Sequence, residues 1–435
     1  WTSAIVGDVI TYTFMPFADN ANIFGNDIVN RLIGNGFTPG NVTIKTTNTT
    51  GIKNITTNGE FTFNSSKFIN KNGAFMTSGD YGLTPNGVIV TASTGSQLGT
   101  VFINQDLYGS NIKATSYTFK IEAGGSIVSN GKIEFGSGVW NLNYSGNHID
   151  FNAGMSISLS NLISTQGQGA AAGYTIVKSN GGNISLTAGE NIKINASATL
   201  QSSGGTNVDG SGPTQYTTSN GGNITITAGN GITIKSNIDA SSGYIGKGLN
   251  GNIKVSNGNT SITPSGGINE GISTGIIKGG NLIKEGLGII ALNALNTYNG
   301  TTTINSGTLQ LGINNSIPVA TSFKLNGGTF NTGGYSQGVA SITLADNAAM
   351  NFSNSVANTF TVNAIGSFTT GKILTINNWD GTYAAPGSTG NYGKLIINGT
   401  ALTSTLLSQI KFYNATDATL HSAIQLGSKE VVAGN

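Results

Sequence analysis

The sequence predicts an all-β fold, a right-handed parallel β-helix (β-solenoid) with β-rich N-terminal and C-terminal caps. Three observations predict it: a segment that occurs twice, runs of residues that alternate between apolar and hydroxyl side chains, and a composition that favours strands and turns. The chain has 435 residues, of which 65 are glycine and only 9% are charged. Asn, Thr and Ser fill the positions between Ile, Val, Leu and Phe, which is typical of strands and turns and unfavourable for helices.

The segment that occurs twice runs from Ser179 to Gly189 and returns from Ser219 to Gly229. In both copies, Ser-Asn-Gly-Gly-Asn-Ile leads into a run in which every second residue is apolar. Period-two runs that recur at a long fixed interval indicate stacked strands, because a unit this small cannot bury its apolar face without a neighbour. We therefore expect the two copies to be adjacent in space within the stack.

The pattern divides the chain into three regions. Residues 1–100 alternate without a clear repeat and are expected to form a β-rich N-terminal cap that covers the open backbone groups of the first coil. Residues 101–350 carry the regular pattern of the solenoid, at roughly 20 residues per coil. Residues 351–435 are expected to form a C-terminal β-rich cap with one short helix, which begins at Thr403 or Ser404 because either hydroxyl can cap it.

A second motif lies at residues 280–312. It contains a lysine, several glycines, an Asn-Thr-Tyr-x-Gly turn and a Gly-Thr-Leu-x-Leu-Gly strand. This segment resembles the autotransporter-associated β-strand repeat of bacterial secreted surface proteins, and it departs from that pattern at Ala294 and Leu295. The Gly-Gly-Asn-Ile copies resemble the coils of filamentous-haemagglutinin-like β-helix adhesins. The resemblance implies a secreted, extracellular protein at the cell surface.

Charge and cysteine content narrow the classes of partner. The formal net charge is +2 and Arg31 is the only arginine. No basic run suited to neutralising phosphates is present, so nucleic acid is not an expected partner. The chain has no cysteine, which excludes disulfides and thiolate metal sites.

No stretch of about 18 apolar residues occurs, so no transmembrane segment is expected. The first residue is Trp1, and we expect that a leader precedes it in the precursor.

The ionisable residues form no pattern typical of catalysis. The two histidines, His148 and His421, have no metal-ligand spacing around them, and His148 is expected in a surface turn. The carboxylates are scattered singly, whereas glycosidic bond cleavage needs two of them on one face. Glu190 is replaced by Asn230 in the second copy, so no acidic ladder follows that position. We predict no catalytic, cofactor or metal site, and therefore a protein that is not an enzyme.

Rows of hydroxyl side chains are expected on the outside of the coils. They comprise Ser185, Thr187, Thr225, Thr227 and Thr233. Such rows are the ordinary surface of a weakly charged solenoid. A flat threonine face could also order water as ice-binding solenoids do, and this alternative stays open.

Two segments are candidates for interaction. Ile10, Tyr12 and Phe14 alternate within one strand and form a candidate assembly strand that could complete the sheet of a neighbouring subunit. Aromatic residues are frequent near both ends of the chain, where they can serve as cap cores or as joints. Residues 204–213 offer nothing to bury and are expected to form a surface loop, with Asn207 and Asp209 as candidate binding residues.

Two functions follow from these expectations. The first is a non-enzymatic extracellular structural protein without cofactors, which forms a cell-surface filament or matrix by head-to-tail assembly of its copies through their end regions. The alternative is an adhesin or autotransporter-type passenger stalk that binds surface glycans or neighbouring cells. The family resemblance favours the adhesin, and the two caps favour the filament.

Overall fold

The computed structural model describes five continuous stretches of the chain and ten isolated strands. The stretches are 118–134, 147–167, 180–205, 220–242 and 276–434, the last without 354, 384 and 386. The isolated strands are β1 (Thr2–Val6), β2 (Val9–Phe14), β3 (Asn20–Phe24), β4 (Asn41–Ile44), β5 (Asn54–Asn58), β6 (Val88–Thr91), β7 (Thr100–Ile103), β8 (Leu107–Tyr108), β21 (Ile253–Asn257) and β22 (Gly271–Ser273). The chain forms two compact units: unit 1 holds residues 1–229 and 233–253, and unit 2 holds residues 230–232 and 254–435.

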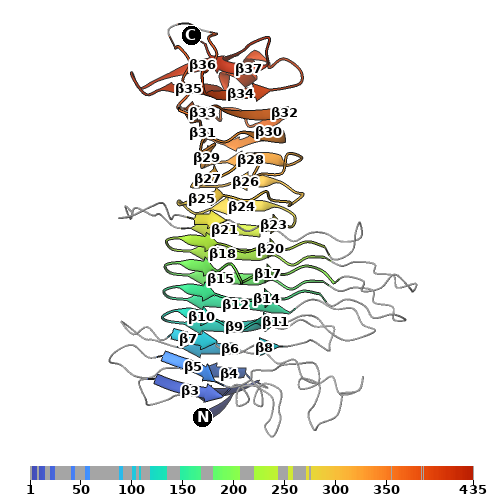
Figure 1. Ribbon diagram of the computed structural model, residues 1–435, viewed down its shortest axis with the longest axis vertical. Coiled ribbons are helices and arrows are strands. Elements are labelled where there is room, and N and C mark those ends of the chain that lie inside the picture. Colours follow the sequence, from blue (N-terminus) through green and yellow to red (C-terminus); the bar gives the residue numbers. More distant parts are fainter. Residues whose placement is uncertain are drawn as a thin grey trace, which may run out of the picture. The chain divides into compact units, whose positions relative to one another are not determined.

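From β6 onward, the coils of unit 1 each contribute one strand to each of three parallel sheets (Figure 1), and β1, β2 and β4 form a separate sheet. Sheet 1 contains β6, β9 (Thr118–Ala123), β12 (His148–Ala153), β15 (Ile184–Ala188) and β18 (Ile224–Ala228). Sheet 2 contains β3, β5, β7, β10 (Ile127–Ser129), β13 (Ile157–Leu159), β16 (Ile192–Ile194) and β19 (Ile232–Ile234). Sheet 3 contains β8, β11 (Ile133–Glu134), β14 (Ile163–Ser164), β17 (Leu200–Gln201) and β20 (Ile238–Asp239).

The two copies of the repeated segment lie in adjacent coils of unit 1, as predicted. β15 pairs in parallel with β18, with Ile184 opposite Ile224 and Ser185 opposite Thr225. Along both strands the apolar side chains are buried and the hydroxyl side chains are partly exposed. Each coil therefore covers the apolar face of the next, which removes apolar area from water all along the stack. The predicted outward rows of hydroxyl groups are confirmed for these two strands.

The coils of unit 1 are longer than the predicted length of roughly 20 residues. Ile127 pairs with Ile157, and Ile157 pairs with Ile192, so successive coils place residues 30 and then 35 positions apart in register. The next step is 40 positions. The expectation is wrong for this unit because each coil also contains the short sheet 3 strand and a connection back to sheet 1. Neither feature has a strong period-two signal in the sequence.

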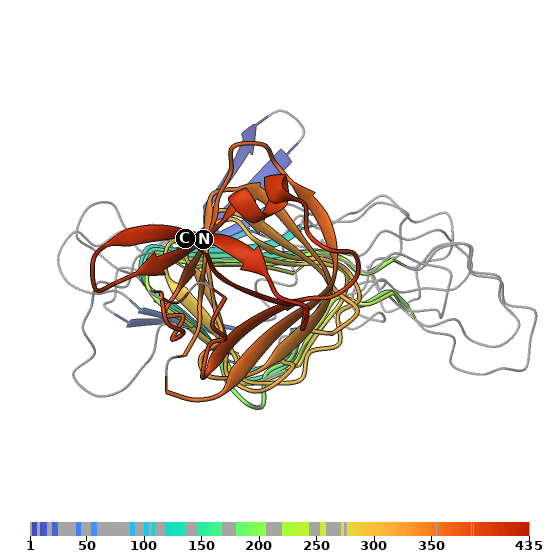
Figure 2. The same cartoon turned by 90° about the horizontal axis from the view of Figure 1, so that it is seen from above.

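From β24 (Leu282–Glu285) onward, unit 2 has shorter coils with two strands each. Besides β21 and β22, its strands are β23 (Ile277–Lys278), β24, β25 (Ile289–Leu292), β26 (Thr302–Ile304), β27 (Thr308–Leu311), β28 (Ser322–Asn326), β29 (Thr329–Asn331), β30 (Gln337–Asp346), β31 (Ala348–Asn351), β32 (Asn358–Phe368), β33 (Leu374–Asn377), β34 (Gly393–Ile397), β35 (Ile410–Asn414), β36 (Thr419–Gln425) and β37 (Glu430–Ala433). Residues 20 to 21 positions apart are hydrogen-bonded from coil to coil between β24 and β29. Seen from above, the orange and red strands of unit 2 enclose a common interior (Figure 2).

The C-terminal end of unit 2 changes from parallel to antiparallel pairing. β35 pairs in parallel with β33 and antiparallel with β36, while β37 pairs antiparallel with both β34 and β36. The helix α3 (Ser404–Ser408) packs there, and Thr403 Oγ1 accepts a hydrogen bond from Leu406 N at 3.2 Å. The predicted short helix and its Thr403 cap are therefore confirmed.

The predicted limits of the solenoid do not coincide with a change of pairing. Parallel pairs continue after residue 350 from β31 through β33 to β35, and β3, β5 and β7 are already paired in parallel at or before residue 103. The reason is that strands of a cap and strands of a coil show the same alternation in the sequence. Only their partners differ.

Candidate functional site

The candidate assembly strand is β2, which contains Ile10, Tyr12 and Phe14. It is the middle strand of a three-stranded sheet: β1 pairs with it antiparallel and β4 pairs with it in parallel. Tyr12 lies opposite Ser3 on one side and opposite Val42 on the other. A strand joins another sheet through an unpaired backbone edge. Donation by β2 therefore requires that β1 or β4 first be displaced.

The candidate binding residues Asn207 and Asp209 lie outside the described residues. The chain on either side of them is described, and its two ends meet. Gly222 N donates a hydrogen bond to Ser202 O at 2.7 Å, and Ser202 Oγ donates one to Gly222 O at 2.8 Å. The base of the segment 206–219 is thus fixed to the stack.

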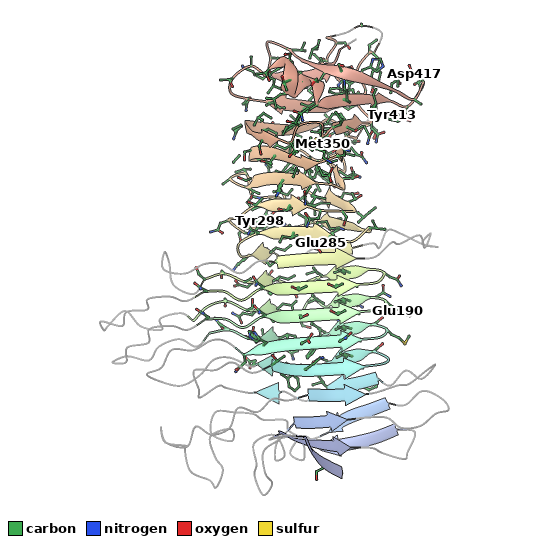
Figure 3. The ribbon with its side chains drawn as sticks, turned by 180° about the vertical axis from the view of Figure 1, so that it is seen from behind. Glu190, Glu285, Tyr298, Met350, Tyr413 and Asp417 are labelled. Carbon is green, nitrogen blue, oxygen red and sulfur yellow. The ribbon has the colours of Figure 1, made fainter. Side chains whose placement is uncertain are left out.

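The segment that resembles the autotransporter repeat spans β24 to β27 of unit 2. Its lysine, asparagine and tyrosine all point into the interior: Lys284 and Tyr298 are 1% exposed and Asn296 is 6% exposed. Figure 3 marks Tyr298 together with Glu285, the neighbour of Lys284 at the end of β24. In the sequence these residues stand out only as parts of a motif. Their polarity at inward-facing positions was the signal that could have singled them out.

The buried ammonium of Lys284 joins two coils. Its Nζ donates hydrogen bonds to the backbone oxygens of Glu285, of Gly286 at 2.8 Å and of Ser306 at 3.3 Å. These carbonyls lie at the corners after β24 and β26, where Gly286 and Gly307 adopt positive φ angles of 69° and 65°. Burial lowers the pKa of Lys284 to about 8, and the carboxylate of Glu285 opposes this by raising it.

The depressed pKa of Lys284 predicts that unit 2 gains stability as the pH rises above 8. The lysine has a pKa of 10.5 when unfolded and about 8 when folded, so the unfolded chain holds more protons between these values and stability rises with pH across that window. From pH 8 to pH 9.5 we expect a gain of about 1.5 kcal/mol from this group. Urea unfolding of wild type and Lys284→Met at both pH values measures it. If the stability of both proteins changed equally with pH, Lys284 would not be the source of the pH dependence.

Asn296 and Gln337 bridge successive coils with their side-chain amides. Asn296 Oδ1 accepts from Ile277 N at 2.8 Å, and its Nδ2 donates to Ser316 O at 2.8 Å. Gln337 Oε1 accepts from Ile317 N at 3.0 Å and its Nε2 donates to Ile317 O at 2.8 Å. Both amides form hydrogen bonds with backbone N–H and C=O groups in the segments that connect the two strands of a coil. They replace the ladder hydrogen bonds that a third strand would supply.

Ala294 and Leu295, where the segment differs from the repeat that it resembles, directly precede Asn296, which enters the interior. Ala294 is 9% exposed, and its carbonyl accepts a hydrogen bond from Asn296 Nδ2 at 3.1 Å. Leu295 points outward and is 60% exposed. Tyr298 follows, and its hydroxyl lies 2.6 Å from Thr302 Oγ1. The two unusual residues therefore flank the turn without disturbing the buried polar contacts.

Ladders of amide side chains run along the outside of unit 2. Asn305 Nδ2 donates to Glu285 Oε1 at 3.1 Å, and Asn326 Nδ2 donates to Asn305 Oδ1 at 3.0 Å. On the other sheet, Asn331 Nδ2 donates to Gln310 Oε1 at 3.1 Å. Further along this sheet, Asn377 Nδ2 donates to Asn351 Oδ1 at 2.8 Å. Each of these hydrogen bonds joins one coil to the next and adds to the backbone ladder between them.

The chain was compared with protein-family models, curated proteins and solved structures. No match was found in any of the three comparisons. The resemblance to autotransporter and haemagglutinin-like repeats therefore remains a prediction from the motifs alone. None of the helical residues that the structure describes forms a segment of the length and hydrophobicity needed to span a bilayer.

His148 lies in a strand, which corrects the expected surface turn. It begins β12, and its Nδ1 accepts a hydrogen bond from Asn183 N at 2.8 Å in the next coil. Burial lowers the pKa of this histidine. The expectation was wrong because the polar residues before His148 suggested a turn, whereas pairing with β9 and β15 draws it into the sheet.

Two of the described carboxylates each accept a hydrogen bond. Glu190 accepts a hydrogen bond from Ser156 Oγ at 3.3 Å at a corner of unit 1 (Figure 3). Glu430 is 3% exposed and accepts from Gly390 N at 3.1 Å in the C-terminal cap. Within the described part of the chain, no three His, Asp or Glu side chains are grouped so that they could hold a metal ion.

Proposed function

We propose that the protein is a non-enzymatic structural element of an extracellular surface, built on a right-handed parallel β-helix. The parallel pairing of successive coils supports this fold, because crossovers between parallel strands of one sheet are right-handed in nearly all proteins. The bridging of coils by backbone, amide and lysine hydrogen bonds carries the proposal. Such a stack resists local opening, since a coil can leave only if its bonds to both neighbours break.

We propose further that copies assemble head-to-tail into a filament or matrix through their end regions. The two ends of the chain differ in a way that suits an asymmetric joint. Antiparallel strands close the C-terminal end of unit 2. Near the N-terminus, β3 pairs only with β5 among the described strands of sheet 2. β1 is an outer strand of its own sheet. An outer strand near the N-terminus is the feature that strand addition requires.

Negative-stain electron microscopy of two truncated chains tests the assembly and locates the joint. Removal of residues 1–8 takes away β1 and leaves an edge of β2 unpaired, while removal of residues 1–17 takes away both strands. If β2 is the assembly strand, the first truncation still forms filaments and the second does not. If β1 is the joint, both truncations abolish filaments. Filaments that persist in both would refute strand addition by this segment.

The alternative function, an adhesin or passenger stalk that binds surface glycans, is favoured by the fixed base of the segment 206–219. A loop held at its base can present residues such as Asn207 and Asp209 without disturbing the stack. Replacement of 206–219 by a short Gly-Ser linker tests it, with the same replacement of 168–179 as the control. Glycan-array binding that is lost only with 206–219 supports the adhesin. Equal binding by both variants and wild type contradicts a role for this loop.

A further inference from the structure

The repeated Gly-Gly-Asn segments of unit 1 lie beside the ends of the sheet 3 strands. Thr165 follows β14, and Gly182 precedes β15. In the next coil, Ser202 follows β17, and Gly222 precedes β18. We call the chain after Thr165 and Ser202 the departing chain and the chain before Gly182 and Gly222 the returning chain.

Two hydrogen bonds join the departing and returning chain in each coil, and we call each set a clamp. In the first clamp, Gly182 N donates to Thr165 O at 2.8 Å, and Thr165 Oγ1 donates to Gly182 O at 2.7 Å. The second clamp has the same pattern between Gly222 and Ser202, at 2.7 and 2.8 Å. Both hydroxyl residues are 0% exposed, so each side chain acts as a buried partner for the backbone of the returning chain.

The glycines of the motif are required by the close approach of the returning chain. A Cβ atom on Gly181 would lie 1.8 Å from Ser202 O, and one on Gly222 would lie 2.0 Å from Gly182 O. Both neighbours are backbone atoms, which cannot move aside as a flexible side chain could. The repeated motif therefore marks points at which the backbones of successive coils come close together.

The clamps have the same geometry although they bracket segments of different length. Thr165 and Gly182 are 17 positions apart, and Ser202 and Gly222 are 20 positions apart. The departing chain is also bonded to the coil above it, through Gly167 N to Ser203 O at 2.8 Å and Gly204 N to Ser241 O at 3.0 Å. The described ends of each bracketed segment are therefore held by the stack.

We propose that the clamps close the coils of unit 1 independently of the residues between them, so that this corner accepts segments of varied length and sequence without loss of the stack. The closure free energy of a loop changes only slowly with its length once its ends are fixed. This inference is independent of the proposed function: it holds for a filament subunit and for an adhesin alike.

Cleavage of the chain within a bracketed segment tests the inference. A recognition sequence for a site-specific protease is inserted into residues 206–219 of the full chain, and the protein is cut under native conditions. We expect the two fragments to elute together and the unfolding midpoint to stay within about 2 °C of the uncut protein. Fragments that separate, or a midpoint that falls well beyond this, would overturn the proposal. The same insertion at 154–156, the tight corner between β12 and β13, is the control that should lower the midpoint.

Two substitutions at Ser202 test the hydroxyl of the second clamp. Ser202→Thr keeps the donor, as Thr165 does in the first clamp, and should leave the midpoint of the cut protein unchanged. Ser202→Ala leaves the carbonyl of Gly222 without this donor and should lower the midpoint of the cut protein more than that of the uncut protein. Equal midpoints for the two variants after cleavage would refute the clamp.

Discussion

Gly189→Ala is expected to lower the free energy of unfolding of unit 1 by about 3 kcal/mol. Gly189 lies at the corner after β15, between Gly154 and Gly229 of the adjacent coils. A Cβ atom on Gly189 would lie 2.1 Å from Gly154 O. Gly189 N also donates a hydrogen bond to Ala153 O at 2.9 Å, so the coils cannot separate to make room without breaking the ladder.

Urea unfolding followed by circular dichroism measures this loss. Gly427→Ala is the control for methyl addition, because no heavy atom lies within 4 Å of a Cβ at that position, and its effect should stay within about 0.5 kcal/mol. A Gly189→Ala protein as stable as the Gly427→Ala protein would show that the coils are not in contact at this corner.

Phe330→Ala is expected to destabilise unit 2 by about 3 to 5 kcal/mol. Phe330 forms a core cluster with Phe323 and Phe360, and all three side chains are 0% exposed. The ring centroid of Phe330 lies 5.0 Å from each of the other two. Because these rings come from three strands, β28, β29 and β32, removal of Phe330 leaves a cavity that neighbouring coils cannot fill without breaking their hydrogen bonds.

Thermal and urea unfolding of Phe330→Ala measure this effect, with Tyr335→Ala as the control on the surface. Tyr335 is 38% exposed, and its truncation should cost well under half as much. Similar losses for the two variants would mean that the aromatic residues do not form a shared core.

The stacking could be predicted from the sequence because the repeat shows which residues of neighbouring coils lie opposite each other. Identical residues in two copies can bury the same face only if they lie one above the other, and Ile184 does lie opposite Ile224. The length of the other coils could not be predicted, since residues 135–146 and 168–179 between strands carry no repeat. The helix near Thr403 was predictable because its capping signal is local.

The site residues were less predictable, because their roles depend on partners distant in the sequence. The period-two pattern identified β2 as a strand but could not show that both of its edges are paired. The motif contained Lys284, but its three carbonyl partners come from turns whose direction depends on glycines with positive φ. A charged residue at an apolar position of a strand is the sequence signal for such a buried contact.

Cross-linking of neighbouring coils tests the stacked arrangement most directly. The chain has no cysteine, so Ser185→Cys with Thr225→Cys places two unique thiols on paired outward positions of β15 and β18. Parallel neighbours lie about 4.8 Å apart, so a short thiol-specific reagent should join them within one molecule in nearly every chain. Ser185→Cys with Thr233→Cys, on different sheets, should give little product. Equal yields from the two pairs, or links only between molecules, would contradict the stack.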